Sequence, residues 1–165
     1  MDKAACLLVG EVNPYGRSPD YALYPLPRRA AGNRLRIILG VTDLEYLAAF
    51  TRVNLCDGAW SVRAARAKAA ELLARPGVSL VVGLGARVRD VFGFDLPFFG
   101  ARRYMDVGGP LFVSLPHPSG RCREWNKPGR VAMARTLMNE YYPGVNWGSA
   151  DPKRVVPLLA DEGLL

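Results

Sequence analysis

Three polar side chains stand at the ends of strand-like segments in this sequence: Asn13, Asn54 and His117. The segments before Asn13 and His117 are continuous apolar runs, which are typical of strands buried on both faces of a parallel sheet. Ligands bind outside the carboxyl ends of such strands, because loops and helix N-termini converge there. We therefore expect the two amides and the imidazole to meet at one edge of a sheet and to form a site.

His117 is the only histidine in the chain. It stands between Pro116 and Pro118, which stiffen the backbone, and it is followed by Ser119 and Gly120. A hydroxyl and a glycine can approach a phosphate at little steric cost. The alternative is a structural histidine that satisfies neighbouring polar groups.

Each of the other candidates also has a structural alternative. Asn13 precedes a proline, and asparagine before proline is a common turn former. The amide of Asn54 can satisfy backbone groups at the end of a strand, and Tyr15 and Tyr24 can be ordinary half-buried aromatic residues. The expected convergence of these residues at one sheet edge favours the functional interpretation.

The elements that must position these side chains alternate between strands and helices, which indicates an α/β fold with three α/β/α layers around a central, mostly parallel, four-stranded sheet. Residues 16–32 contain three prolines and no sustained period, so we expect a long loop near the site. Residues 94–106 remain open, with a hairpin arm as one interpretation. The predicted strands span 4–9, 52–56, 78–84 and 110–115, and the predicted helices lie within 33–50, 61–75, 86–92 and 126–142.

Length and composition limit the class of protein. The chain has 165 residues, 50% of them hydrophobic and 22% charged, which predicts one globular domain over residues 1–165. A core of this size needs neither a disulfide nor a metal to fold. The longest apolar runs are far shorter than the roughly 20 residues that span a bilayer, and the first residues do not read as a leader peptide. We expect a cytoplasmic protein without membrane contact.

The cysteines and the charge add two expectations. Cys6, Cys56 and Cys122 are widely spaced and form no CxxC pair, which indicates reduced thiols and argues against a zinc or iron–sulfur site. The chain carries 22 Lys and Arg against 15 Asp and Glu, for a formal net charge of +7. This excess is compatible with a phosphate-rich partner such as nucleic acid.

Two motifs resemble those of the uracil-DNA glycosylase superfamily. The segment Glu11-Val-Asn-Pro-Tyr15 is similar to its first motif, which ends Asp-Pro-Tyr in the uracil-excising branch and reads Asn-Pro-Gly in the mismatch-specific branch. The segment His117-Pro-Ser-Gly120 is similar to its second motif, which is His-Pro-Ser in the former and Asn-Pro-Ser-Gly in the latter. Asn54 matches the position of a base-reading asparagine. The resemblance extends over residues 4–142 and mixes features of both branches.

The resemblance implies a monofunctional DNA glycosylase that hydrolyses the N-glycosidic bond of a flipped uracil or modified pyrimidine and leaves an abasic site, without metal or cofactor. It implies that His117 stabilises the departing base and that Asn13 positions water. An amide cannot accept a proton as a carboxylate does, so we expect slower chemistry than in branches that carry aspartate. The substrate-binding residues implied by the resemblance are Glu11, Tyr15, Tyr24 and Asn54, with Tyr24 as the stacking ring and Tyr15 facing C5 of the base.

The loop after the second motif is expected to contact DNA. We expect the protein to be a monomer. In the superfamily this loop inserts a leucine into the base stack, and here Arg121 stands in its place. A guanidinium can stack and contact phosphates, and Trp125 can stack on a base. The alternative is a solvated basic turn in which Trp125 anchors the next helix. The predicted DNA-binding residues are Ser119, Gly120, Arg121, Arg123 and Trp125.

Several alternatives remain open at the level of sequence. The substrate can instead be a bulky 5-modified cytosine, hydroxymethylated or glucosylated, excised from phage DNA as antiviral defence. A third possibility is a catalytically weak or inactive DNA-binding protein on the same fold. Gly83 and Gly85 are interpreted as close strand–helix packing because a dinucleotide fingerprint would need a third glycine. Four basic residues can belong either to a solvated face or to a phosphate track: Arg28, Arg29, Arg34 and Arg36.

Overall fold

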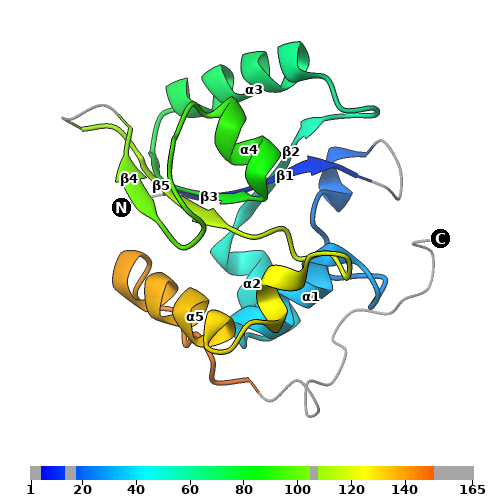
Figure 1. The fold of residues 1–165 in the computed structure, drawn as a ribbon, viewed down its shortest axis with the longest axis vertical. Coiled ribbons are helices and arrows are strands. Elements are labelled where there is room, and N and C mark those ends of the chain that lie inside the picture. The colour runs from blue at the N-terminus through cyan, green and yellow to red at the C-terminus, as the bar shows by residue number, and fades with distance from the viewer. Residues whose placement is uncertain (1–4, 14–17, 105–107, 151–165) are drawn as a thin grey trace.

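A single mixed sheet of five strands forms the centre of the molecule (Figure 1). The structure is a computed structural model that describes residues 5–13, 18–104 and 108–150. Along the sheet the strand order is β2-β1-β3-β5-β4, with β4 antiparallel to β5 and all other neighbours parallel. The strands are β1 (Ala5–Val12), β2 (Thr51–Cys56), β3 (Val78–Leu84), β4 (Ala101–Arg103) and β5 (Leu111–Leu115).

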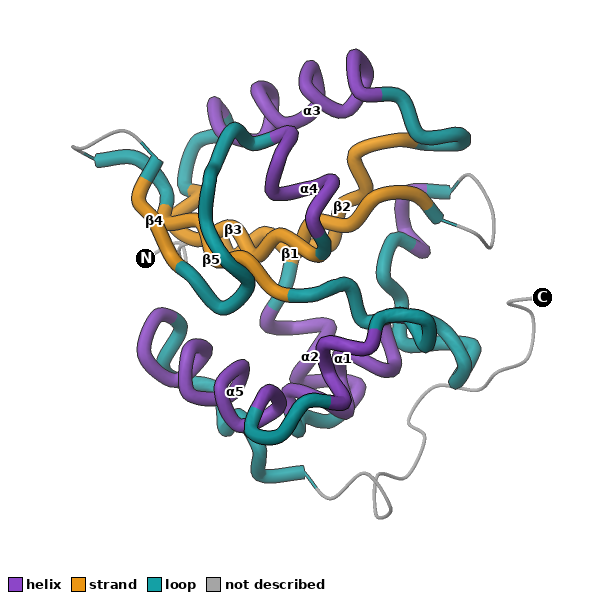
Figure 2. The backbone as a smooth tube through the Cα atoms, viewed as in Figure 1, coloured by secondary structure: helices purple, strands orange, loops and turns teal. Residues whose placement is uncertain are grey.

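Helices cover both faces of this sheet, which confirms the predicted α/β class and its layers (Figure 2). Helices α3 (Val62–Ala74) and α4 (Ala86–Val91) lie on one face, and α1 (Ala31–Leu39), α2 (Asp43–Ala49) and α5 (Arg130–Tyr141) lie on the other. Short 3₁₀ turns occupy Pro19–Tyr21 and Arg123–Asn126. Within the described part of the chain, no helix has the length and apolar character needed to cross a bilayer.

Two differences from the predicted elements have local causes. The sheet has five strands where four were predicted, because β4 pairs with β5 in the segment left open as a hairpin arm. Arg102 and Arg103 of this edge strand are exposed, so it carries no apolar alternation that could reveal it. Helix α5 begins at Arg130 rather than 126, because Pro128 and Gly129 interrupt the backbone, the latter at φ 78°.

The central strands are apolar without a break because each face of the sheet meets a helical layer. In β1, Cys6 and Leu8 pack toward α1, α2 and α5, whereas Leu7 and Val9 pack toward α3 and α4. All four side chains are buried. Burial on both faces fixes the register of β1, since a shift of one residue would exchange the two sets. The carboxyl end of the strand is therefore held at a defined place.

Side-chain caps fix the starts of two helices, and close packing fixes β3. Thr42 and Glu45 form a capping box at the start of α2, with N–H to side-chain distances of 3.2 and 2.7 Å. Ser61 accepts a hydrogen bond from the Ala64 N–H at the start of α3. A Cβ on Gly83 would lie 2.5 Å from the Phe112 ring of β5 and 3.2 Å from the Val88 side chain of α4. Gly83 therefore packs closely against the helix, as predicted, and still more closely against a ring from the neighbouring strand.

Candidate functional site

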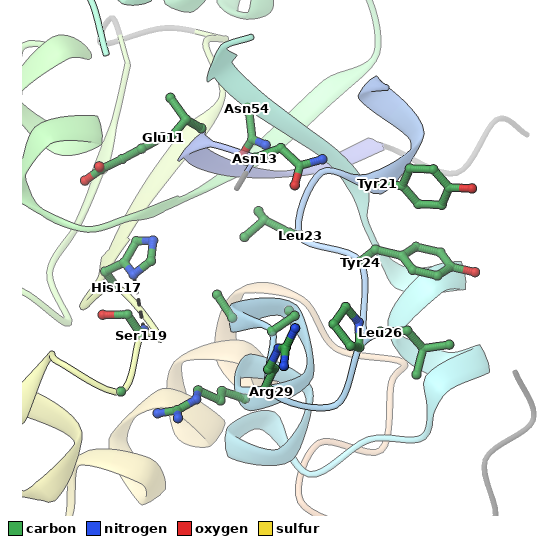
Figure 3. Close-up of a pocket in the computed structure, with 17 residues that line it drawn as sticks. Glu11, Asn13, Tyr21, Leu23, Tyr24, Leu26, Arg29, Asn54, His117 and Ser119 are labelled. Carbon is green, nitrogen blue, oxygen red and sulfur yellow. Dashed lines mark hydrogen bonds between the residues drawn. The ribbon is translucent and has the colours of Figure 1, made fainter. Parts of the chain in front are cut away.

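The carboxyl ends of β1 and β2 and the loop after β5 meet at a cavity of about 390 Å³ (Figure 3). Strand β1 supplies Glu11 and leads directly to Asn13, strand β2 supplies Asn54, and the chain leaving β5 supplies His117. The structure thus brings together the polar residues that the sequence placed at one sheet edge. Three further predicted residues also line the cavity: Tyr24, Ser119 and Gly120.

His117 is held in a single hydrogen-bonding state. Its Nδ1 accepts a hydrogen bond from the Ser119 N–H at 3.2 Å. Burial lowers the pKa of the imidazole, and the negative charge of Glu11 partly opposes that shift. A neutral imidazole that accepts at Nδ1 carries its proton on Nε2. In its neutral form, which burial favours, His117 therefore carries a hydrogen-bond donor at Nε2.

Trp125 supports the backbone of this histidine. Its Nε1 donates a hydrogen bond to the His117 carbonyl at 3.2 Å, and its ring packs edge-on against Phe99 with centroids 5.6 Å apart. Trp125 does not line the cavity among the described residues. These contacts give it the anchoring position that the sequence left open as an alternative to base stacking.

Asn54 offers a buried hydrogen-bond acceptor. It is paired with Gly10 across β1 and β2, and a Cβ at Gly10 would come within 2.7 Å of its Oδ1. In the described part of the chain this buried oxygen accepts no hydrogen bond. A buried acceptor without a donor costs about 1–3 kcal/mol. A ligand that presents an N–H at this point would remove that cost.

Glu11 and Asn13 line the same cavity as this acceptor. The Glu11 carboxylate is 3.7 Å from the Arg87 guanidinium, which in turn lies over the Trp60 ring. Asn13 is partly buried and lines the cavity. Tyr15, which was predicted to face C5 of a base, lies outside the residues that the structure describes.

The opposite wall is formed by the loop before α1 and by the start of that helix. Figure 3 shows Leu23 between His117 and the two asparagines, with the rings of Tyr21 and Tyr24 on the side away from His117. The Arg52 guanidinium lies over the Tyr24 ring at 5.1 Å, and Tyr21 packs edge-on against it. Tyr24 is thus part of the cavity wall, at a distance from the imidazole.

Three long-range contacts fix this loop. The buried Tyr46 donates its hydroxyl to the Leu23 carbonyl at 2.8 Å, and Arg52 donates to the carbonyls of Asp20 and Ala22. A Cβ on Gly32 would lie 2.2 Å from the Leu23 carbonyl, so the loop is in direct contact with the first turn of α1. These hydrogen bonds and the contact with Gly32 hold the loop in place, in addition to its prolines.

Leu23 is a lining residue that the sequence did not single out. Its φ is 49°, in the left-handed region that side chains other than glycine rarely adopt. Its side chain lies against Gly10, near Asn54. Residues in such conformations cluster at functional sites, where the surrounding structure holds them. No sequence signal could have found it, because leucine gives no indication of a positive φ.

The four basic residues of the loop and α1 separate into two pairs. Arg28 and Arg36 both bind the buried carboxylate of Asp43, at 2.9 and 3.0 Å. Arg29 and Arg34 are exposed and line the cavity, and no acidic side chain in the described ranges forms an ion pair with either. The first pair is structural, whereas the second presents positive charge to whatever enters the cavity.

Two other predicted DNA-binding residues lie outside the cavity wall. Arg121 and Arg123 are exposed on the loop that follows Gly120. Among the described residues, no three side chains of His, Cys, Asp or Glu come together as a metal site would require.

No protein-family model matches the chain, and a search of curated proteins finds no significant match. The assignment of function therefore depends on the residues and their geometry.

Proposed function

We propose that this chain is a monofunctional DNA glycosylase that hydrolyses the N-glycosidic bond of a flipped pyrimidine and leaves an abasic site. The observation that carries the proposal is the neutral His117, whose Nε2 donor shares one cavity with Asn13 and with the unsatisfied Asn54 oxygen. The mostly parallel sheet with its site at the strand ends also suits a uracil-DNA glycosylase-like fold. The two motifs that resemble that superfamily supply Asn13 and His117, and Asn54 stands at the matching position of a base-reading asparagine.

The reaction breaks the bond between C1′ of deoxyribose and the base nitrogen. The electron pair stays with the base, and negative charge develops on its carbonyl oxygen while the sugar gains oxocarbenium character. The Nε2–H of His117 donates to that oxygen, which lowers the barrier where charge develops. Water then forms the new bond to C1′ and loses a proton to solvent. The Asn13 amide orients this water but cannot take its proton.

Recognition of the base is assigned to the buried acceptor and to the loop wall. The Asn54 oxygen accepts a hydrogen bond from an N–H on the Watson–Crick edge, which both uracil and cytosine present. Leu23 and Tyr24 pack against the extruded base, and Glu11 lies beside His117. The exposed arginines and the Ser119 loop contact the DNA backbone.

A bulky 5-modified cytosine is the second candidate substrate, and the size of the cavity favours it. About 390 Å³ falls in the range of roughly 300–1,000 Å³ that accommodates drug-sized ligands. The cavity extends beyond Leu23 to Tyr21 and Arg29, so a substituent on C5 has space on that side. The cytosine amino group would donate to the Asn54 oxygen. Such an activity suits a defence against phages with modified DNA.

A panel of oligonucleotides tests the proposal. The purified chain is incubated with strands that contain uracil, a thymine mismatch, 5-hydroxymethylcytosine or its glucosylated form, and abasic sites are then cleaved with alkali. Base release from at least one of these is expected, and the preferred base decides between the two candidate substrates. No release from any of them, together with tight DNA binding, would contradict the glycosylase and support a protein that only binds DNA.

A further inference from the structure

A second hollow lies directly beside the cavity. It is a shallow groove of about 230 Å³ between α1 and the loop that follows His117. The cavity and the groove share three lining residues, namely Arg34, Ser119 and Gly120. The far part of the groove is lined by Ile37, Ile38 and Trp125. The two hollows are therefore adjacent, and Arg34 is the charged side chain that lines both.

Arg34 lies at this meeting point as an available cation. It is exposed, and none of the ion pairs in the described ranges involves it. Its guanidinium lies over Gly120, because a Cβ there would come within 2.5 to 2.8 Å of the guanidinium atoms. The absence of a side chain at position 120 lets the cation lie against the loop that carries Ser119. A guanidinium in this position can bind a phosphate through two parallel N–H donors.

The order of the three features matches the order of groups in a DNA strand. A dinucleotide consists of a base, a phosphate that carries one negative charge, and a second base. Here the cavity with its polar strand-end residues is followed by the exposed Arg34 guanidinium beside a serine and then by a groove with apolar and aromatic walls. Grooves that combine positive charge with aromatic side chains are typical of proteins that bind single strands.

We propose that this groove binds the nucleotide next to the flipped one in single-stranded DNA, with Arg34 bound to the phosphate between the two nucleotides. The inference rests on the proposed function, because it takes the cavity as the site of the flipped base. In a duplex the neighbouring base is stacked and paired, so it cannot enter a hollow beside the first. The chain therefore prefers single-stranded or locally opened DNA over an intact duplex.

A binding measurement tests this preference independently of any base release. Fluorescence anisotropy is recorded for a labelled single-stranded 12-mer of deoxythymidine and for a labelled hairpin duplex of equal charge. We expect the single strand to bind about tenfold more tightly, as contacts to one stacked base and its phosphate would give. Equal affinity for the two, or tighter binding of the duplex, would overturn the proposal.

Three variants test whether Arg34 causes the preference for single strands. Arg34→Gln should weaken single-strand binding about tenfold while changing duplex binding little. Gly120→Ala displaces the guanidinium but keeps its charge, so a smaller loss of about threefold is expected. Arg66→Gln removes an exposed charge on α3 and serves as the matched control, with unchanged binding. Equal losses in Arg34→Gln and Arg66→Gln would show that only net charge matters and would overturn the proposal.

The two proposals fail in different ways. If the panel of modified bases yields no base release but single strands still bind through Arg34, the glycosylase assignment is wrong and the groove is retained. If a base is released at the same rate from single strands and duplexes, and Arg34→Gln has no selective effect on binding, the glycosylase is retained and the groove assignment is wrong.

Discussion

The two walls of the cavity are built by different means. The strand-end wall consists of polar groups that a buried parallel sheet holds in place: Asn13, Asn54 and His117. The loop wall is largely apolar and is held by contacts from distant residues, such as the Tyr46 hydroxyl on the Leu23 carbonyl. The difference indicates a division of labour, in which the rigid wall performs the chemistry and the loop wall selects the base.

Loss of the imidazole should give the largest effect. His117→Ala removes the side chain assigned to donate to the departing base, so kcat should fall by about 10²–10³-fold, as when one oxyanion donor is removed. The KM should change little, because the donor acts mainly in the transition state. Single-turnover kinetics measure this, with the melting temperature as the check on folding. A change confined to KM would assign His117 to binding instead of chemistry.

Asn54 tests the recognition function of the same wall. Asn54→Ala removes the buried acceptor, and we expect kcat/KM to fall about ten- to hundredfold, in line with the roughly 1–3 kcal/mol of a good amide–base contact. Because both bases present an N–H to this oxygen, kcat/KM for uracil and for cytosine derivatives should fall together. The assay compares kcat/KM for both bases in the variant and the parent. Unchanged kcat/KM for both bases would remove Asn54 from base recognition.

A substitution in the loop wall should change selectivity between bases more than it changes kcat. Leu23→Gly suits the positive φ at this position and widens the cavity beside Asn54, so folding should be preserved. We expect kcat for the preferred base to change by about threefold or less, while kcat/KM for bases with larger C5 groups increases by a similar factor, as one lost apolar contact allows. Competition between two substrates in one reaction measures the ratio. A large fall in kcat without a change in selectivity would contradict the division of labour.

The pH profile should show the smallest effect. His117 must be neutral to accept the Ser119 N–H and donate through Nε2, so kcat is lost as the pH falls through its pKa. Burial lowers that pKa, which places the acid limb below the ordinary value of about 6.5. The Glu11 carboxylate raises the pKa, so Glu11→Gln should move the limb to still lower pH. A limb that moves upward would mean that Glu11 does not act through its charge on His117.

Much of the strand-end wall could be predicted because it depends on local patterns. The apolar runs before Asn13 and His117 identified buried parallel strands, and such strands place their carboxyl ends at one edge. The helix predicted over 61–75 is likewise present as α3, and Ser61 caps its start. The sheet acquired a fifth strand because three residues at an edge, two of them exposed, pair through their backbone alone.

The loop wall could not be predicted because its conformation is set by distant contacts. The positive φ of Leu23 follows from the Tyr46 hydroxyl, the Arg52 guanidinium and the close approach of Gly32, none of which is adjacent in sequence. The same holds for the arginines, since only the fold shows that Asp43 lies between Arg28 and Arg36. Trp125 had two interpretations, and the hydrogen bond to the His117 carbonyl shows its anchoring contact.

The central claim is that the residues of the strand-end wall catalyse hydrolysis of the N-glycosidic bond of a base in DNA. One reaction tests this claim most directly. Free base and strand breaks are quantified in the same sample, by mass spectrometry and by gel, before and after alkali. We predict that free base accumulates while the strand stays intact, and that alkali then produces one break for each base released. No free base, or strand breaks that accompany base release without alkali, would contradict a monofunctional glycosylase.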